Sequence, residues 1–326
     1  LARLAWSAGA LGPPPPPPPE EVRLRGRKHS KGRDARAISH HYDVSNEFFR
    51  LVLGESMTYS CAYFESPDYS LEQAQEAKHD LVCRKLGLEP GMRLLDVGCG
   101  WASMAMHAAR HYGVRVVGVT ISRQQAELAR ARVEEAGLAD SVEVRLQDYR
   151  DVDDGPYDAI SSIGMFEHVG LSRLGLYFRT VACLLRPGGR LLNHGISRPA
   201  AIPPISPKSF VSRYVFPDGE LHEVGSVVSA IQAAGLEARD VESLREHYSR
   251  TLRFWVANLE SNWERAVKLV GEGRARVWRL YMAASAMNFA ANRTSVHQVL
   301  AVRTDGSGRS GMPATREELL AARQPA

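Results

Sequence analysis

The feature of this sequence that most limits the choice of fold is a regular alternation of short apolar strands with helix-forming segments, which begins near residue 93. The pattern predicts two helices, over residues 101–112 and 123–137, and six strands, over residues 93–97, 114–119, 142–146, 159–163, 190–194 and 295–302. Such alternation favours an α/β fold with a doubly wound, mostly parallel sheet. Ligands of these sheets bind beyond the carboxyl ends of the strands, so we expect the functional site at that edge.

A glycine-rich turn follows the first predicted strand, in the segment LLDVGCGWAS from Leu94 to Ser103. Gly98 and Gly100 lack Cβ atoms, so the backbone can turn sharply and a ligand can approach its amides. The start of the next helix favours a carboxylate, and Asp96 is placed to accept a hydrogen bond from a ligand ammonium. Two glycines alone also fit a plain strand-to-helix turn. The loop lacks the third glycine of a dinucleotide fingerprint, and the chain contains no phosphate-loop pattern.

The segments around this region divide the chain into three parts. Residues 1–37 form a predicted disordered leader, with a proline run at 13–19 and a basic arm at 23–36 that holds seven Lys and Arg residues against one Asp. Residues 38–303 form the predicted main domain, which is mainly helical up to about residue 88. Its insertion at 198–222 is rich in proline and begins a lid that extends to about 292. The polar tail, 304–326, is expected to be loose.

The composition narrows the environment of the protein. No run of residues approaches the ~18 apolar positions that suggest a membrane span. The four cysteines include no C-x-x-C pair, so the sequence predicts neither a disulfide framework nor a metal site. No basic and then apolar signal segment follows Leu1, and we expect a cytoplasmic protein. The basic arm is either a solvated segment or is attracted to an anionic surface, and both a bilayer and a nucleic acid fit its charge.

Eight segments of the sequence resemble, in the same order, the cyclopropane fatty acid synthases and the related mycolic acid methyltransferases. The resemblance covers about residues 38–303 and includes HHYDVSNEFF, MTYSCAYF, DVGCGW, VVGVTISRQQ, LQDYRD, SIGMFEHVG, NHGIS and HYSRTLRFW. It implies the Rossmann-like fold of a class I methyltransferase, with helical N-terminal insertions and an acyl-binding lid. It also implies that S-adenosylmethionine is the methyl donor and that the acceptor is a cis double bond in a lipid acyl chain.

The resemblance also implies which residues bind the donor. Nine are expected there: Tyr59, Ser60, Asp96, Gly98, Gly100, Thr120, Gln125, Asp148 and Tyr149. Tyr59 and Ser60 are expected at the methionine part, and Asp148 and Tyr149 beside the adenine. Many methyltransferases of this fold carry an acidic residue at the end of the second strand, but Thr120 and Gln125 occupy that region here. Both can hydrogen-bond to the ribose hydroxyls, although neither accepts as strongly as a carboxylate.

The chemistry of the implied reaction accounts for four further residues. Methyl transfer to an alkene generates a carbocation, and a base must then remove a proton before water enters. Members of the family hold a bicarbonate ion for this purpose, and the resemblance assigns its binding to Cys61, Glu167, His194 and Tyr248, with the backbone of Ile196 close by. Taken singly, each of the four has a structural alternative: a small buried thiol, a helix start, a core histidine and a packed tyrosine.

Three positions depart from the pattern of the family. Ala102 follows the glycine loop where the family often has glycine, which predicts slight crowding of the donor. Ser285 stands where a cysteine is frequent, and this favours bicarbonate over a thiol as the base. Gly195 stands where threonine is common, so the local hydrogen bonding is expected to differ.

Several alternative functions remain open at this point. The same first step gives a methylene- or methyl-branched acyl chain if the proton leaves elsewhere. A non-catalytic protein that binds lipid or nucleic acid on this scaffold, or a methyltransferase for RNA or a small molecule, would share the fold. The mostly apolar residues of 198–222 suit an acyl chain better than a polar base. We therefore expect unsaturated phospholipid acyl chains as partners, peripheral contact with an anionic membrane at its inner face, and no nucleic acid. The sequence also permits a homodimer.

Overall fold

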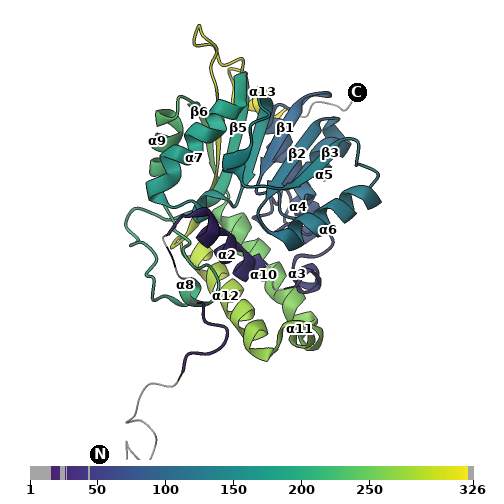
Figure 1. Ribbon diagram of the computed structural model, residues 1–326, viewed down its shortest axis with the longest axis vertical. Coiled ribbons are helices and arrows are strands. Elements are labelled where there is room, and N and C mark those ends of the chain that lie inside the picture. The colour runs from purple at the N-terminus through teal and green to yellow at the C-terminus, as the bar shows by residue number, and fades with distance from the viewer. Residues whose placement is uncertain (1–15, 23–25, 27, 43–44, 322–326) are drawn as a thin grey trace, which may run out of the picture.

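The computed structural model describes residues 16–321, except residues 23–25, 27 and 43–44. Within this part of the chain, the strands are β1 Arg93–Val97, β2 Arg115–Thr120, β3 Val142–Leu146, β4 Tyr157–Ile163, β5 Leu185–Ser197, β6 Glu237–Ser243 and β7 Ser295–Val302. They form one mixed sheet in the order β3-β2-β1-β4-β5-β7-β6 (Figure 1). Strands β1 to β5 run parallel, and β7 is antiparallel to both of its neighbours.

Helices cover both faces of the sheet. One face packs against α4 (Leu71–Leu86), α5 (Ser103–Tyr112), α6 (Arg123–Glu135) and the short α13 (Arg316–Leu320). The other face packs against α7 (Leu171–Leu184) and α9 (Val224–Ala233). α4 has clear ends, because Ser70 and Gln73 form a capping box and Gly87 closes the helix in the left-handed conformation.

A third layer of helices lies beside the carboxyl edge of the sheet (Figure 1). It consists of α2 (Lys31–Tyr42), α3 (Asn46–Leu53), α8 (Phe210–Tyr214), α10 (Arg245–Ser261), α11 (Trp263–Val270) and α12 (Glu272–Ala290). Buried aromatic side chains fill much of its core, among them Phe48, Phe49, Trp255 and Trp278. In the part of the chain that the structure describes, no helix is long and apolar enough to cross a membrane.

The α/β fold with a Rossmann-like, mostly parallel sheet is confirmed. β1, β3 and β7 have the predicted bounds, whereas β5 extends in both directions beyond residues 190–194. β6 was not predicted, because it is an edge strand with partly exposed side chains and no apolar run. The later part of the predicted lid, which extends to about residue 292, consists of three helices, α10, α11 and α12, since Asn262 and Gly271 interrupt it.

The N-terminal segment is more ordered than the predicted leader. α2 begins at Lys31, so residues 31–37 belong to a helix and not to a disordered arm. Its basic side chains pair with the main domain, Lys31 with Asp151 at 2.6 Å and Arg33 with Asp218 through two contacts. The leader boundary at residue 37 is therefore too late. Residues 1–15 and 23–25 lie outside the described residues, so their predicted disorder stays a prediction.

The C-terminal tail also contains an ordered part. α13 packs against α4, and Leu319 is buried in the core on that face of the sheet. Arg316 forms ion pairs with Asp240 and Glu242 of β6. The expectation of a loose tail is thus wrong for residues 316–320, because tertiary ion pairs order a segment that is polar in sequence.

Candidate active site

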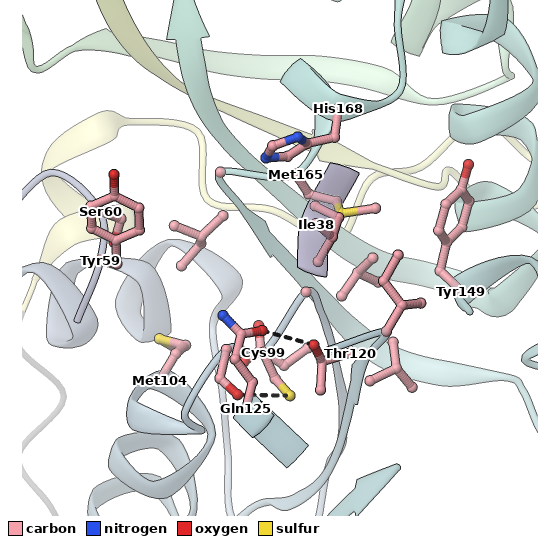
Figure 2. A pocket seen from close by; sticks show the side chains of 18 of the residues that line it. Ile38, Tyr59, Ser60, Cys99, Met104, Thr120, Gln125, Tyr149, Met165 and His168 are labelled. Atoms are coloured by element: carbon pink, nitrogen blue, oxygen red, sulfur yellow. Dashed lines mark hydrogen bonds between the residues drawn. The ribbon is translucent and has the colours of Figure 1, made fainter. Parts of the chain in front are cut away.

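A cavity of about 240 Å³ lies at the carboxyl edge of the parallel strands. All nine residues predicted to bind the donor line it: Tyr59, Ser60, Asp96, Gly98, Gly100, Thr120, Gln125, Asp148 and Tyr149. Figure 2 shows Tyr59 and Ser60 on one side of the cavity and Tyr149 on the opposite side, with Thr120 and Gln125 between them. The fold therefore brings the predicted donor residues together, and their contact with a donor stays a prediction.

The glycine loop borders this cavity and depends on unusual backbone angles. Gly98 and Gly100 have φ angles of 76° and 55°, in the region that favours glycine. A Cβ atom on Gly100 would meet no atom within 4 Å, which leaves open space beside the backbone. Ala102 also has a positive φ, 65°, but its methyl group packs in the core under α5. The predicted crowding of the donor by Ala102 is wrong, because Ala102 is not among the described residues that line the cavity.

Asp96 is a buried carboxylate at the end of β1 with one oxygen available. Its Oδ1 accepts a hydrogen bond from Ser161 Oγ at 2.7 Å, whereas Oδ2 has no hydrogen-bond partner among the described atoms. Burial raises the pKa of Asp96 to about 6, and the hydrogen bond from Ser161 and the charge of Lys78 offset only part of this effect. A ligand ammonium is a partner that such a carboxylate can accept from.

Thr120 and Gln125 form a neutral pair at the place predicted for the ribose hydroxyls. Thr120 Oγ1 donates to Gln125 Oε1 at 2.9 Å, and Figure 2 draws this bond as a dashed line. Ser122 caps α6 by accepting from Gln125 N, which places Gln125 in the first turn of the helix. The amide nitrogen of Gln125 can then donate to a ligand hydroxyl. The pair can thus hold a diol without a carboxylate.

The end of the cavity that is predicted to hold the adenine is closed by α2. Asp148 accepts three hydrogen bonds from Arg150, at 2.9 Å from the backbone nitrogen and at 2.8 Å and 2.6 Å from the guanidinium. Arg150 also donates to Asp34 of α2 at 3.2 Å, and Asp34 and Ile38 line the cavity. Sequence reasoning missed this contribution, because the basic composition before residue 37 is typical of a solvated arm.

The end that is predicted to hold the methionine part is supported by two buried side chains of α4. Gln75 Nε2 donates to Ser60 O at 2.9 Å, and Lys78 Nζ donates to Ser60 Oγ at 3.0 Å. Lys78 is only 1% exposed and lines the cavity. The sequence contained a signal for Lys78, because helical periodicity places it on the buried face with Ala74 and Leu81.

Glu167 and His194 lie beside the donor cavity: Met165 and His168, close to Glu167 in sequence, line it, and so does Ile163, which pairs with His194 in the sheet. Glu167 Oε1 accepts a hydrogen bond from Ile196 N at 2.6 Å. The backbone amide of Ile196, which was expected close to the anion, is therefore already occupied. Glu167 Oε2 and His194 Nε2 are buried without a hydrogen-bond partner among the described atoms. Burial raises the pKa of Glu167 to about 7 and lowers that of His194 well below its usual value.

Cys61 and Tyr248 both contact the carbonyl oxygen of Leu244, Cys61 through its thiol and Tyr248 through its backbone amide. The Cys61 thiol donates to Leu244 O at 3.5 Å and to Ala62 O at 3.2 Å, and the Tyr248 amide donates to Leu244 O at 3.1 Å. Burial raises the pKa of Cys61 well above its usual value, so the thiol is neutral. Of the described residues that line the cavity, none is one of the four predicted catalytic residues. All four are buried in the interior of the protein.

Tyr281 of α12 is a further buried polar residue of the helical layer. Burial raises its pKa to about 12, and hydrogen bonds with Tyr59 and Ser285 partly oppose this effect. Tyr281 thereby links Ser285 to Tyr59 at the donor cavity. Sequence reasoning considered Ser285 but missed Tyr281, one turn earlier on α12, because Tyr59 comes from a distant segment that only packing brings to this helix.

A group of potential metal ligands lies outside the cavity. Glu76 of α4 and His107 and His111 of α5 bring their ligand atoms within 4.8 Å of one another. The two histidines are one helical turn apart, a spacing that suits a divalent cation. The sequence predicted no metal site, since Glu76 comes from a different helix. None of the three residues lines the donor cavity.

Solved structures with the same architecture define the class of the protein. Mycolic acid cyclopropane synthase CmaA1, in a crystal structure complexed with SAH and CTAB, aligns with a TM-score of 0.77 and 36% sequence identity over 82% of this chain and 97% of that chain. Coclaurine N-methyltransferase bound to N-methylheliamine and SAH aligns with a TM-score of 0.74 over 85% and 84% of the two chains, but at 24% identity it supports the fold alone. With the glycine loop at the edge of the sheet, these likenesses define a class I, S-adenosylmethionine-dependent methyltransferase.

Sequence comparison then gives the family. The family described as mycolic acid cyclopropane synthetase matches residues 29–299. The probable fatty acid methyltransferase Rv3720 of Mycobacterium tuberculosis is 50% identical over 306 residues, which are 92% of this chain and 71% of that protein. A probable fatty acid methyltransferase of Pseudomonas putida is 47% identical over 300 residues, 90% and 75% of the two chains. The chain belongs to the mycolic acid cyclopropane synthetase family, as its motifs predicted.

Proposed function

We propose that this methyltransferase transfers a methylene group from S-adenosylmethionine to the cis double bond of an unsaturated phospholipid acyl chain, which closes a cyclopropane ring. The helical layer supports an acyl acceptor, because its buried aromatic side chains form an apolar wall near the donor cavity. The names of relatives support the same class of substrate, since they describe fatty acid methyltransferases and cyclopropane mycolic acid synthases.

The observation that carries the proposal is that Glu167 Oε2 and His194 Nε2 are both buried without a hydrogen-bond partner among the described atoms. Methyl transfer to an alkene leaves a carbocation, and the new methyl group must lose a proton for the ring to close. A carboxyl group with a pKa of about 7 can exchange a proton near neutral pH, as a general acid or base requires. Burial of both side chains keeps water away from such a cation.

We further propose that Cys61, Glu167, His194 and Tyr248 hold a bicarbonate ion, which would supply the base. His194 fits this role, because Gln298 Nε2 lies 3.3 Å from His194 Nδ1 and donates to it. The ring proton then sits on Nε2, which can donate to an anion. Glu167 fits when it is protonated, since a neutral carboxyl group can also donate. The neutral thiol of Cys61 adds no charge that would repel the ion.

A second product is favoured by the two most similar relatives named above, both described as probable fatty acid methyltransferases. The same carbocation gives a methyl-branched alkene if a neighbouring chain carbon loses the proton. It gives an exocyclic methylene group if a hydride first shifts from the methylated carbon to the cationic carbon and the methyl group then loses the proton. Both outcomes use the same donor site, so product analysis has to separate them.

The test is incubation of the purified protein with S-adenosylmethionine labelled in its methyl group and with vesicles of oleoyl phospholipid. We expect label in the phospholipid acyl chain and high-field ring protons in its NMR spectrum. Exocyclic methylene protons or a new methyl doublet would replace the ring by the branched product. Label that enters only free or carrier-bound acyl chains would overturn the choice of phospholipid.

Variants of Glu167 and His194 test their role. Glu167→Gln and His194→Gln should each lower turnover roughly 10²- to 10⁴-fold and leave donor affinity nearly unchanged, because neither side chain lines the donor cavity. His111→Gln, an exposed histidine of α5, is the matched control. Turnover should fall in bicarbonate-free buffer and recover when bicarbonate is added. Full turnover without bicarbonate would leave Glu167 or His194 as the direct base, and parallel loss of donor affinity in both variants would indicate a structural role.

We also propose that the protein works at the inner face of an anionic membrane. Ion pairs with acidic residues of the main domain already engage three basic side chains of the arm: Lys28, Lys31 and Arg33. Arg23, Arg25 and Arg27 lie outside the described residues, and each would add ~1 kcal/mol of attraction near an anionic surface. Vesicle binding should therefore weaken as salt rises. Equal turnover on neutral and anionic vesicles at low salt would contradict this role of the arm.

A further inference from the structure

Lys78 is a buried cation at the methionine end of the donor cavity. Its side chain is 1% exposed, and Nζ donates one hydrogen bond, to Ser60 Oγ at 3.0 Å. Within the described part of the chain, Lys78 forms no ion pair with a carboxylate. A buried ammonium with a single hydroxyl partner is unfavourable, because its other two N–H groups are not compensated and Asp96, which favours its charged form, makes no direct ion pair with it.

Lys85 shows what the same helix provides when a buried lysine is structural. It lies two turns further along α4 and is 0% exposed. Its Nζ contacts Glu242 Oε2 at 2.6 Å and Asp240 Oδ2 at 3.2 Å, so two carboxylates of β6 balance its charge. Among the described residues, Lys78 thus lacks the direct carboxylate partners of Lys85, and the carboxylate of a ligand would supply one.

Asp96 provides the complementary half of the same end of the cavity. Its Oδ2 is buried and has no partner among the described atoms, and both Asp96 and Lys78 line the cavity. The methionine part of S-adenosylmethionine carries one ammonium and one carboxylate. We propose that Lys78 binds the carboxylate of the donor while Asp96 binds its ammonium, so that the two buried charges recognise the amino-acid part as a zwitterion. This inference rests on the donor assignment of the proposed function.

The electrostatics of the cavity agree with this role. Burial lowers the pKa of Lys78 to about 7, so the uncomplexed ammonium loses much of its preference for the charged form. A bound carboxylate would restore the charge by direct pairing. Gln75 separately holds the backbone of Ser60, so the loop has a support that does not depend on Lys78.

The test compares two ligands that differ only in the carboxylate, S-adenosylhomocysteine and its decarboxylated analogue, by calorimetry. The parent protein should bind S-adenosylhomocysteine roughly 10- to 100-fold more tightly, as expected for a charge-assisted hydrogen bond. Lys78→Met should remove most of this preference by weakening S-adenosylhomocysteine alone. Lys78→Gln keeps a polar group that can bond to Ser60 and should lose the preference as well. Lys85→Met, on the same helix, should lower the melting temperature and keep the preference.

The outcomes separate the assignment of Lys78 to the donor carboxylate from the assignment of the cavity to the donor. Equal weakening of both ligands by Lys78→Gln and Lys78→Met would show that Lys78 only positions Ser60, and this would overturn the inference. A parent protein that binds both ligands equally would also overturn it. A parent protein that binds neither ligand would instead contradict the donor assignment itself. Should Lys78→Met fail to fold, as a melting curve would reveal, Lys78→Gln and the parent ratio still decide the question.

Discussion

The two walls of the active site are held together by different forces. At the edge of the sheet, directed hydrogen bonds orient polar side chains, such as Ser161 to Asp96 and Thr120 to Gln125. In the helical layer, aromatic packing does this work: the rings of Phe49 and Trp278 lie 5.3 Å apart between centroids. Burial therefore acts in opposite directions at the two walls. It stabilises the apolar layer by about 25 cal/mol per Å² and destabilises the ionised form of Asp96.

The largest expected effect tests the aromatic wall. Trp255 of α10 is 0% exposed, and its ring lies 5.2 Å from that of Tyr59 between centroids. Trp255→Ala should lower the free energy of unfolding by about 3–5 kcal/mol, because truncation leaves a cavity that the layer cannot fill. Urea denaturation measures the change. Met287→Ala on α12 is the control, since Met287 is 69% exposed and should change stability by less than about 0.5 kcal/mol. Similar small changes in stability for both variants would contradict the idea that aromatic packing holds the helical layer together.

The second prediction tests the charged wall through pH. Asp96 and Glu167 have pKa values of about 6 and about 7, raised by burial from 3.8 and 4.5. Because the folded state binds these protons more tightly, their contribution to stability is complete below about pH 4 and is lost as the pH rises through 6 and 7. Each shift corresponds to about 3 kcal/mol. Asp96→Asn and Glu167→Gln should therefore become more stable, relative to the parent protein, as the pH rises from 5 to 8.

Denaturation across that pH range, without donor, measures the difference. The comparison with the parent protein matters, because buried histidines such as His194 act in the opposite direction as the pH falls. Asp140→Asn, at an exposed position, is the control and should follow the parent curve. Parallel curves for the parent and both buried variants would show that these carboxyl groups are hydrated in solution.

The same contrast explains what the sequence could predict. The residues at the sheet edge belong to short motifs in which a strand ends in a turn, so spacing along the chain fixes spacing in the fold. Asp96, Gly98 and Gly100 were predicted from such a motif, whereas the resemblance to the family supplied the other six donor residues, and all nine line one cavity. Tyr281 and Asp34 were missed because the residues that they contact at the cavity, Tyr59 and Arg150, come from distant segments. The four predicted catalytic residues were assigned by resemblance alone, and no local pattern indicated that Cys61 would contact Leu244.

The third prediction concerns Gly195, which precedes Ile196, the residue of β5 whose amide donates a hydrogen bond to Glu167. A Cβ atom on Gly195 of β5 would overlap the ring of Phe166, which precedes Glu167. Gly195→Thr introduces the residue common in the family and should displace this ring, at a loss of about 1–3 kcal/mol in stability and a larger loss in turnover than in donor affinity. Gly225→Thr is the control, because a Cβ atom there meets nothing within 4 Å. Unchanged stability and turnover in Gly195→Thr would show that Phe166 can move without disturbing Glu167.

The smallest expected effect concerns α2, the segment of the helical layer whose residues Asp34 and Ile38 line the donor cavity. Arg33 pairs with Asp218 while both side chains are mostly buried, at 14% and 13% exposed, whereas Lys31 and Asp151 are more than half exposed. An exposed pair is screened by solvent and contributes little. Arg33→Gln should therefore loosen α2, which carries Asp34 and Ile38 at the cavity, and raise the dissociation constant of S-adenosylhomocysteine by a few-fold, as a loss of about 1 kcal/mol implies. Lys31→Gln is the matched control and should leave that constant unchanged. Calorimetry at low and at high salt measures both, and the effect of Arg33→Gln should shrink as salt rises. Equal donor affinity in the parent protein and Arg33→Gln at low salt would mean that α2 does not act as a wall of the donor site.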